Sequence, residues 1–381
     1  MSLTNIHIRH NNDYETLSLP LNVSCENFNE HLRTNPLLRN KAKTALQNRT
    51  VTFRNPIAKE GIPIIHIQQR EMAHVSSKQY GGKGAILVSD AATTCHVMAI
   101  RSCYKRSNIV SSLSSKNAIV LGSLTHIDSD NYDECIKLMF QEHVKYHRSI
   151  SSDLQELDEP LNMDIHLVGG YCDKDNTSVK LTKYLLQMIA NISSHYSKTN
   201  ISMNLETCVV SSLNDASILL NDGTTTTTSN TANVSPRPIA RGMALHVTSG
   251  VVQLLETMDP SHIGPGHILR NVRLFSSQSN SLLLVHNPIQ EEIRISPFGW
   301  RHDVRQTNIL LELPDYLLLK YTSTSPECED EDFCDTMRKS LIFMRDVSVE
   351  SVFGKEGQRK SIVFQFHSDW NRHVVSESIE W

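Results

Sequence analysis

No uninterrupted run of apolar residues in the 381-residue sequence approaches the roughly 18 that a membrane-spanning helix needs. The first segment, from Met1 to Asn12, is polar and lacks the apolar core of a secretory signal peptide. We therefore expect a cytoplasmic protein that can also reach the nucleus, and we expect no membrane partner.

Positive charge is not in excess either. The chain has 37 lysines and arginines against 41 aspartates and glutamates, which gives a net charge of −4. Proteins that bind nucleic acid usually present a basic face, so we expect no nucleic-acid partner. The sequence also contains no internal repeat, and we expect a monomer.

The eight cysteines lack the spacings that indicate a metal site or a redox motif. They form no Cys-x-x-Cys pair, and no group of cysteines and histidines has zinc-finger spacing. Disulfides are rare in the reducing cytosol, so we expect neither a disulfide framework nor a metal or other cofactor. Most of the cysteines are then expected to be small buried hydrophobes, and a reactive one must be identified by its neighbours.

The composition that remains is that of a folded protein, 39% hydrophobic and 20% charged. Strands are mixed with a few helices, without the regular alternation of a doubly wound sheet, so we expect an α+β fold with mixed or antiparallel sheets. We divide the chain into an N-terminal extension with one helix (1–60), a main domain (61–350) and a C-terminal segment (351–381). Residues 221–238 form a polar, low-complexity loop within the main domain.

Hydrophobic periodicity predicts the individual elements. Strands are expected at 62–67, 84–89, 96–101, 118–127, 164–168 and 203–210, hairpins at 242–256 and 282–295, and helices at 36–46, 132–147 and 178–192. A further helix is expected to begin at Thr324-Ser325-Pro326, with the acidic residues 327–332 complementing the helix dipole in its early turns. A docking site for a basic partner is the alternative interpretation of these acids.

Cys95 is distinguished from the other cysteines by its surroundings. It ends a tight connection of small residues, from Asp90 to Thr94, between two strands that are expected to be buried. Such a thiol could face a pocket, and the backbone N–H groups around it could stabilise an oxyanion. A free cysteine titrates near 8.5 and needs an imidazole nearby to react at neutral pH.

His126 could supply that imidazole, because it lies near the end of the next strand, 31 positions after Cys95. If residues 102–116 form a surface loop, this strand can return beside Cys95, and either the Ser89 hydroxyl or the Asp128 carboxylate could orient the ring. The spacing alone leaves an inert core cysteine as the alternative. His96 points to the opposite face of its strand and is interpreted as a packed or surface histidine.

Beyond spacing, the motifs at these residues resemble those of the protein N-terminal asparagine amidohydrolase family. The resemblance comprises Gln68–Glu71 (QQRE), Ser89–His96 (SDAATTCH) and Leu124–Asp128 (LTHID). It continues at 166–170, 180–182, 213–215, 294–300 and 323–326, and so covers the chain from about 65 to 345.

The resemblance implies an enzyme that hydrolyses the side-chain amide of an N-terminal asparagine to aspartate, with release of ammonia, and so feeds the ubiquitin-dependent N-degron pathway. Its partners would be proteins or peptides with a free N-terminal asparagine. The implied nucleophile is Cys95, acting through a thioester, and the implied fold is an α-β-β sandwich similar to that of Cys–His deamidases. In those enzymes a hydroxyl residue six positions before the cysteine orients the histidine, which favours Ser89 over Asp128.

The sequence also departs from the family pattern. Ala91 replaces the second acid of an Asp-Asp pair, which leaves Asp90 as the candidate for binding the substrate's α-ammonium group. The alternative role for Asp90 is a turn residue that accepts backbone N–H groups. Asp90, Thr94 and Asp128 are our candidate substrate-binding residues. The competing functions are a deamidase of other glutamine or asparagine amides, a cysteine peptidase, and a module that binds N-terminal asparagine without turnover.

Overall fold

The computed structural model of the protein describes residues 4–10, 13–54, 61–104, 119–150, 160–219, 235–276, 281–286, 291–300, 303–367 and 372–375. The strands are β1 (Thr4–His10), β2 (Asp13–Leu19), β3 (Thr50–Phe53), β4 (Ile64–His66), β5 (Glu71–Ser76), β6 (Ile86–Ser89), β7 (His96–Tyr104), β8 (Val120–Ile127), β9 (Leu161–Gly169), β10 (Ile201–Val210), β11 (Gly242–His246), β12 (Val252–Met258), β13 (Leu283–His286), β14 (Glu292–Ile295), β15 (Ile362–His367) and β16 (Arg372–Val375). The helices are α1 (Cys25–Thr34), α2 (Pro36–Gln47), α3 (Gln79–Gly82), α4 (Asp133–Ile150), α5 (Thr177–Tyr196), α6 (Ala216–Leu219), α7 (His267–Val272), α8 (Val304–Glu312), α9 (Asp315–Thr322), α10 (Phe333–Asp346) and α11 (Val349–Phe353).

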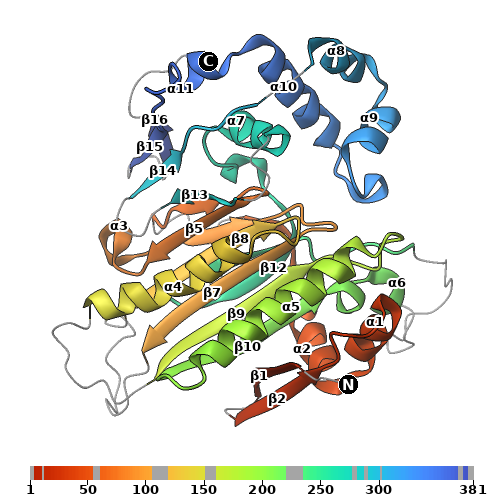
Figure 1. Ribbon diagram of the computed structural model, residues 1–381, viewed down its shortest axis with the longest axis vertical. Coiled ribbons are helices and arrows are strands. Elements are labelled where there is room, and N and C mark those ends of the chain that lie inside the picture. Colours follow the sequence, from red (N-terminus) through yellow and green to blue (C-terminus); the bar gives the residue numbers. More distant parts are fainter. Residues whose placement is uncertain are drawn as a thin grey trace.

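Three layers make up the centre of the molecule. The middle layer is a nine-stranded sheet in the order β10-β9-β7-β8-β5-β13-β14-β15-β16, and a five-stranded sheet in the order β3-β12-β11-β6-β4 packs on it, with β6 against β8 and β11 against β7. Helices α4 and α5 lie across the other face of the large sheet (Figure 1). Both sheets mix parallel and antiparallel pairs, which confirms the predicted α+β class with sandwiched mixed sheets.

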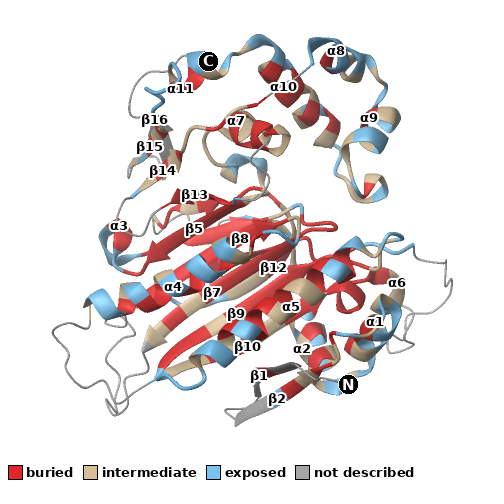
Figure 2. Cartoon of the chain, viewed as in Figure 1, coloured by how far each residue is buried: buried red, intermediate tan, exposed pale blue. Residues whose placement is uncertain are grey.

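This layering explains why the central strands read as continuous apolar runs. All eight residues of β8 are buried, because helices cover one face of the sheet and a second sheet covers the other (Figure 2). A strand that faced water on one side would alternate between apolar and polar residues. Among the described residues, no helix combines the length and apolar character that crossing a membrane requires.

The predicted central strands and helices are found, with ends that differ by a few residues. Asn35 caps α2 as expected, since its side chain accepts the N–H of Leu38 at 3.1 Å, and Pro36 occupies the first turn. The predicted hairpins form between β11 and β12 and between β13 and β14. Residues 102–104 continue strand β7, whereas the expected loops at 105–116 and 221–234 lie outside the described residues.

The N-terminal extension is more ordered than the sequence predicted. Strands β1 and β2 form a hairpin, and β3 joins the five-stranded sheet by pairing in parallel with β12. The prediction of irregular structure with one helix was therefore wrong for the described part of 1–60. In β3, which lies at the edge of the five-stranded sheet, Phe53 alone is buried, so this strand has no apolar run that a sequence pattern could detect.

The helix predicted to begin at Thr324 begins instead at Phe333. Residues 326–328 make one 3-10 turn, and the acidic residues precede the helix and so lie outside its first turn. Local hydroxyl groups compete with helix formation here. The Ser325 N–H donates to Ser323 Oγ at 2.9 Å, and Ser325 Oγ donates to Thr93 Oγ1 at 2.6 Å. Segment 323–332 is therefore a loop, and it is tied to the turn that carries Cys95.

Candidate active site

Cys95 immediately precedes β7, at the end of a turn that leaves β6 after Ser89. Ala91 adopts a left-handed conformation (φ 57°) and is exposed, so the acid that the family has at this position would lie on the surface. The N–H of Ala92 donates to the carbonyl of Arg241 at 2.8 Å. A Cβ on Gly169 would lie 2.4 Å from the Cys95 carbonyl oxygen, so only glycine lets β9 pass this closely beneath the turn.

The strand register places Cys95 and His126 on the same face of the large sheet. Strands β7 and β8 are antiparallel, and Val97 pairs with His126. Cys95 precedes Val97 by two residues, and residues two apart in an extended chain point to the same side. The charge of Asp128 acts on both groups: it adds to the effect of burial on the pKa of Cys95 and opposes the effect of burial on the pKa of His126. Two residues 31 positions apart in sequence are thereby brought to the same end of the paired strands β7 and β8.

Ser89 holds the ring of His126. Its Oγ lies 2.9 Å from His126 Nδ1, and both residues are buried. Ser89 belongs to the five-stranded sheet and His126 to the nine-stranded sheet, so the site forms where the two sheets meet. Within the described part of the chain, His126 Nε2 has no hydrogen-bond partner. The imidazole is thus fixed at one nitrogen and free at the other.

Burial favours the neutral form of both the Cys95 thiol and the His126 imidazole. It raises the pKa of the Cys95 thiol well above its usual value, the charges of Asp128 and Glu329 add to this rise, and Arg70 opposes it. Burial also lowers the pKa of His126 to about 4, although Asp128 acts in the opposite direction. At neutral pH the site therefore holds a thiol and an uncharged imidazole, not a preformed thiolate–imidazolium pair.

Asp128 is held by the Gln-Gln-Arg-Glu segment and does not hydrogen-bond to the histidine. Arg70 Nε donates to Asp128 Oδ2 at 2.6 Å, Gln69 Nε2 donates to the same oxygen at 2.8 Å, and the Tyr132 hydroxyl donates to Oδ1 at 2.7 Å. Arg70 has a left-handed backbone (φ 65°), and its N–H donates to the His126 carbonyl at 3.0 Å. This arrangement brings a cation and an anion together beside Cys95 and leaves Ser89 as the partner of the ring.

Asp90 has partners for both carboxylate oxygens. His66 Nε2 lies 3.1 Å from Oδ1, and the Met258 N–H donates to Oδ2 at 3.1 Å. Hydrogen bonding from His66 and Met258 lowers the pKa of Asp90, against the effect of its burial. These contacts fit the alternative role from the sequence, that of a residue that accepts a backbone N–H.

The remaining candidates have structural contacts. Thr94 Oγ1 lies 2.8 Å from Thr324 Oγ1, which ties the cysteine turn to loop 323–332. His96 lies on the other face of the sheet, fully buried, with its Nε2 2.8 Å from Thr182 Oγ1, as expected of a packed histidine. In the described part of the chain, no cluster of histidine, cysteine or carboxylate side chains could hold a metal.

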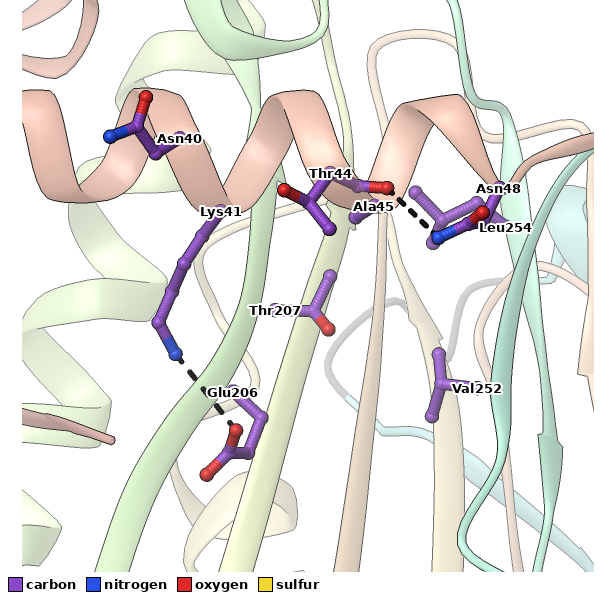
Figure 3. Close-up of a pocket in the computed structure, with 9 residues that line it drawn as sticks. All are labelled: Asn40, Lys41, Thr44, Ala45, Asn48, Glu206, Thr207, Val252 and Leu254. Carbon is purple, nitrogen blue, oxygen red and sulfur yellow. Dashed lines mark hydrogen bonds and ion pairs between the residues drawn. The ribbon is translucent and has the colours of Figure 1, made fainter. Parts of the chain in front are cut away.

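The pocket in Figure 3 is not the site just described. It has a volume of about 400 Å³ and lies between α2, β10 and β12. An ion pair at 3.9 Å between Lys41 and Glu206 lies along it, and none of its lining residues belongs to the Cys95 site. Its lining contains no cysteine and no histidine.

Glu329 and Arg241 were not identified from the sequence. Both act on the Cys95 turn, Glu329 through its charge and Arg241 through the hydrogen bond from Ala92. No signal in the sequence distinguished Glu329 from its acidic neighbours, because the predicted helix would have turned them all toward solvent.

Comparison with known proteins gives one consistent result. The sequence profile of the family described as protein N-terminal asparagine amidohydrolase matches residues 55–372. The protein of that name from Mus musculus is 27% identical over 316 residues, which cover 83% of this chain and 84% of the mouse protein. Those from Sus scrofa and Homo sapiens are 26% and 25% identical, over 74% of this chain and 74% of each relative.

Proposed function

Because the chain belongs to the protein N-terminal asparagine amidohydrolase family, an assignment that makes it a hydrolase of amide bonds, we propose that Cys95 carries out this hydrolysis on N-terminal asparagine. The product would be N-terminal aspartate, and ammonia would be released. The observation that supports the chemistry best is the hydrogen bond between Ser89 Oγ and His126 Nδ1, since it leaves Nε2 without a partner among the described residues.

The reaction begins with attack by the Cys95 sulfur on the side-chain carbonyl carbon of asparagine. His126 Nε2 takes the thiol proton, and the carbonyl oxygen becomes an oxyanion held by backbone N–H groups of the turn; each such donor typically contributes roughly 3 kcal/mol in the transition state. The C–N bond then breaks as His126 gives the proton to the departing ammonia. A thioester remains.

Water completes the cycle. His126 takes a proton from the attacking water, the carbon–sulfur bond breaks, and the proton returns to the Cys95 sulfur, which leaves aspartate. Ser89 accepts from Nδ1–H throughout and so keeps the lone pair on Nε2. The thiol has a raised pKa and the imidazole a lowered one, so complete proton transfer before attack is unfavourable. The proton must move as the carbon–sulfur bond forms.

Selectivity for asparagine over glutamine follows from this geometry. An extra methylene moves the carbonyl carbon by more than a bond length from a fixed thiol, and a misplacement of about 1 Å can cost on the order of a hundredfold in rate. We also propose that the aspartate product enters the ubiquitin-dependent N-degron pathway, and that the enzyme acts in the cytoplasm and the nucleus on proteins with a free N-terminal asparagine.

Mass spectrometry of short peptides tests the proposal. The wild-type protein should convert an Asn-initiated peptide to its Asp form, and Cys95→Ala should abolish conversion. Acetylated-Asn and Gln-initiated peptides are the controls and should remain unchanged. Conversion of a control but not of the free Asn peptide would indicate a deamidase of other amides. Binding without conversion by the wild type would indicate a recognition module.

A further inference from the structure

A buried ion pair lies where the two sheets come together. Arg270, in α7, is 1% exposed, and Glu71, the first residue of β5, is fully buried. Arg270 Nε donates to Glu71 Oε1 at 2.9 Å, and Nη2 donates to Oε2 at 2.5 Å. Two parallel hydrogen bonds of this kind fix the orientation of a guanidinium relative to a carboxylate. The pair is therefore a rigid connection between α7 and the nine-stranded sheet.

The same guanidinium also holds the five-stranded sheet. Arg270 Nη2 donates to the carbonyl of His66, the last residue of β4, at 2.6 Å. Arg270 Nη1 lies 3.5 Å from the Pro265 carbonyl oxygen, and a Cβ on Gly264 would lie 2.9 Å from that nitrogen. The loop before α7 thus packs against the guanidinium. One side chain donates to strands of both sheets.

On one side of the ion pair is the strand that carries Ser89. His66 pairs with Val88 in the parallel strands β4 and β6, and the Ile67 N–H donates to the Val88 carbonyl at 2.8 Å. His66 Nε2 also lies 3.1 Å from Asp90 Oδ1. Val88 and Asp90 are the two neighbours of Ser89 in the sequence, so the position of His66 constrains the backbone on both sides of the Ser89 hydroxyl.

On the other side is the strand that carries His126. Strand β5 pairs with β8, and the carbonyl of Glu71 accepts the Thr125 hydroxyl at 2.9 Å. The Gln68 N–H donates to Glu71 Oε2 at 2.8 Å, so the carboxylate also fixes the turn at 68–71. Within that turn, the Arg70 N–H donates to the His126 carbonyl at 3.0 Å. The position of Glu71 therefore constrains the backbone of His126.

Stability alone gives little reason for an ion pair at this place. Taking two charges out of water is costly, and apolar residues of similar volume in place of a buried ion pair often leave stability unchanged or higher. What the pair supplies is direction, because the guanidinium is bound to a carboxylate of one sheet and a carbonyl of the other. The contact between Ser89 Oγ and His126 Nδ1, at 2.9 Å, also spans the two sheets. Its length depends on their spacing, and hydrogen bonds weaken outside a narrow range of distance.

We propose that Arg270, through its ion pair with Glu71, is a positioning residue for the reaction, because it holds the two sheets at the spacing at which the Ser89 hydroxyl fixes the His126 ring. The inference rests on the proposed function, since it concerns the geometry of the same site. Neither member of the ion pair is assigned a contact with the substrate. A misplacement of about 1 Å can cost on the order of a hundredfold in rate, so a small change in sheet spacing is measurable in kcat.

The test replaces the pair without leaving one charge buried alone. Arg270→Met combined with Glu71→Met is compared with wild type on an Asn-initiated peptide. We expect kcat to fall on the order of 10- to 100-fold, with KM nearly unchanged. Arg270→Lys keeps the cation but not the two parallel hydrogen bonds, and it should lower kcat in the same way if the doubly substituted protein does not fold.

A second ion pair provides the matched control. Arg49 Nε pairs with Glu256 Oε1 at 2.9 Å and so joins the segment after α2 to β12. Arg49→Met combined with Glu256→Met should leave kcat as it is in wild type. A kcat that is unchanged by the substitutions at Arg270 would overturn the inference.

A double-mutant cycle shows whether the pair acts through Ser89. In the Ser89→Ala background the contact with the His126 ring is already lost, so the substitutions at Arg270 and Glu71 should lower kcat no further. Losses that multiply would assign the pair a general structural role and would also overturn the inference.

NMR of the histidine ring nitrogens separates this inference from the proposed chemistry, because it needs no turnover. The signals of His126 are identified by their absence from His126→Gln. In wild type the proton should reside on Nδ1, and replacing the ion pair should mix the two tautomers, as Ser89→Ala should. An unchanged tautomer would contradict the role of Arg270. Mixed tautomers in the variant, together with a wild-type protein that does not convert Asn peptides, would overturn the proposed function alone.

Discussion

The ring of His126 is positioned by one hydroxyl, that of Ser89. The proposed chemistry depends on this contact. The sequence predicted that either Ser89 or Asp128 would orient the ring. The Asp128 carboxylate instead accepts hydrogen bonds from Arg70, Gln69 and Tyr132. The hydroxyl is uncharged, so it fixes the ring without raising the pKa of the imidazole as an ion pair would. A neutral base is suited to a site that is shielded from water.

Ser89→Ala should therefore reduce turnover more than binding. Without its Nδ1 partner the ring is free to rotate and to change tautomer, and loss of a positioned acid–base group typically costs on the order of 10²–10⁴-fold. We expect kcat to fall with KM nearly unchanged. Ser340→Ala, at a buried serine that bonds to Asn271, is the control and should retain turnover. A fall confined to KM would contradict this role for Ser89.

At the scale of secondary-structure elements, the turn that carries Cys95 is connected to loop 323–332, which the sequence predicted as the start of a helix. The Thr324 and Ser325 hydroxyls bond to Thr94 and Thr93, and the Ser325 N–H donates to Ser323 Oγ. These bonds accompany a loop in which the acidic residues precede the first turn of α10. The loop is thereby tied to the turn that carries Cys95. Ser89 ends β6, Cys95 immediately precedes β7, and His126 lies in β8.

Ser325→Ala should loosen this connection. The substitution leaves Thr93 without the hydroxyl that it accepts, and a buried hydrogen bond typically contributes about 0.5–1.5 kcal/mol to stability. We expect a small drop in thermal stability, and a larger drop in kcat/KM for Asn peptides than Ser351→Ala, on the exposed surface, produces. Faster proteolytic cleavage within 323–332 would accompany it. Unchanged activity would show that the site does not depend on the loop's anchoring.

At the scale of the whole molecule, a chain of buried histidines joins the large sheet to the helix that covers it. His74 Nδ1 lies 2.5 Å from Ser123 Oγ, which lies 2.7 Å from His143 Nε2. His143 Nδ1 lies 2.6 Å from Ser102 Oγ, and that hydroxyl lies 2.8 Å from His147 Nε2. Three strands and α4 are connected through neutral imidazoles in place of apolar contacts.

This chain predicts how stability changes with pH. Burial lowers the pKa of His74 and of His147 to about 4 and that of His143 well below its usual value. The folded protein keeps these rings neutral, whereas the unfolded chain takes up protons below about 6.5. Stability is therefore complete above pH 6.5 and is lost as pH falls toward 4, by up to about 1.4 kcal/mol per pH unit for each ring.

Urea unfolding at pH 7.5, 6.5 and 5.5 would measure this loss, with His195 as the comparison site. His195 is exposed, so His195→Gln should leave the pH dependence as it is. His143→Gln should lower stability at pH 7.5 and reduce its dependence on pH. A free energy of unfolding that stays constant over this range would contradict the neutral, buried state of these rings.

The sequence by itself determined the local chemistry and the layered class of the fold. The motifs around Gln68–Glu71, Cys95 and His126 predicted the candidate pair, and the six-residue offset of the family resemblance predicted the Ser89 contact with the His126 ring. Apolar runs located the central strands because burial on both faces leaves no polar position to obscure them. These signals come from residues that are close together in the sequence, so the sequence alone is sufficient to detect them.

The hydrogen-bond partners of the carboxylates near the proposed site became visible in the folded structure alone. Asp90 and Asp128 are adjacent to the reactive residues in sequence, but their oxygens are taken by His66, Met258 and the Arg70 segment. Whether a carboxylate is occupied depends on groups from distant parts of the chain, and a linear pattern carries no record of those contacts.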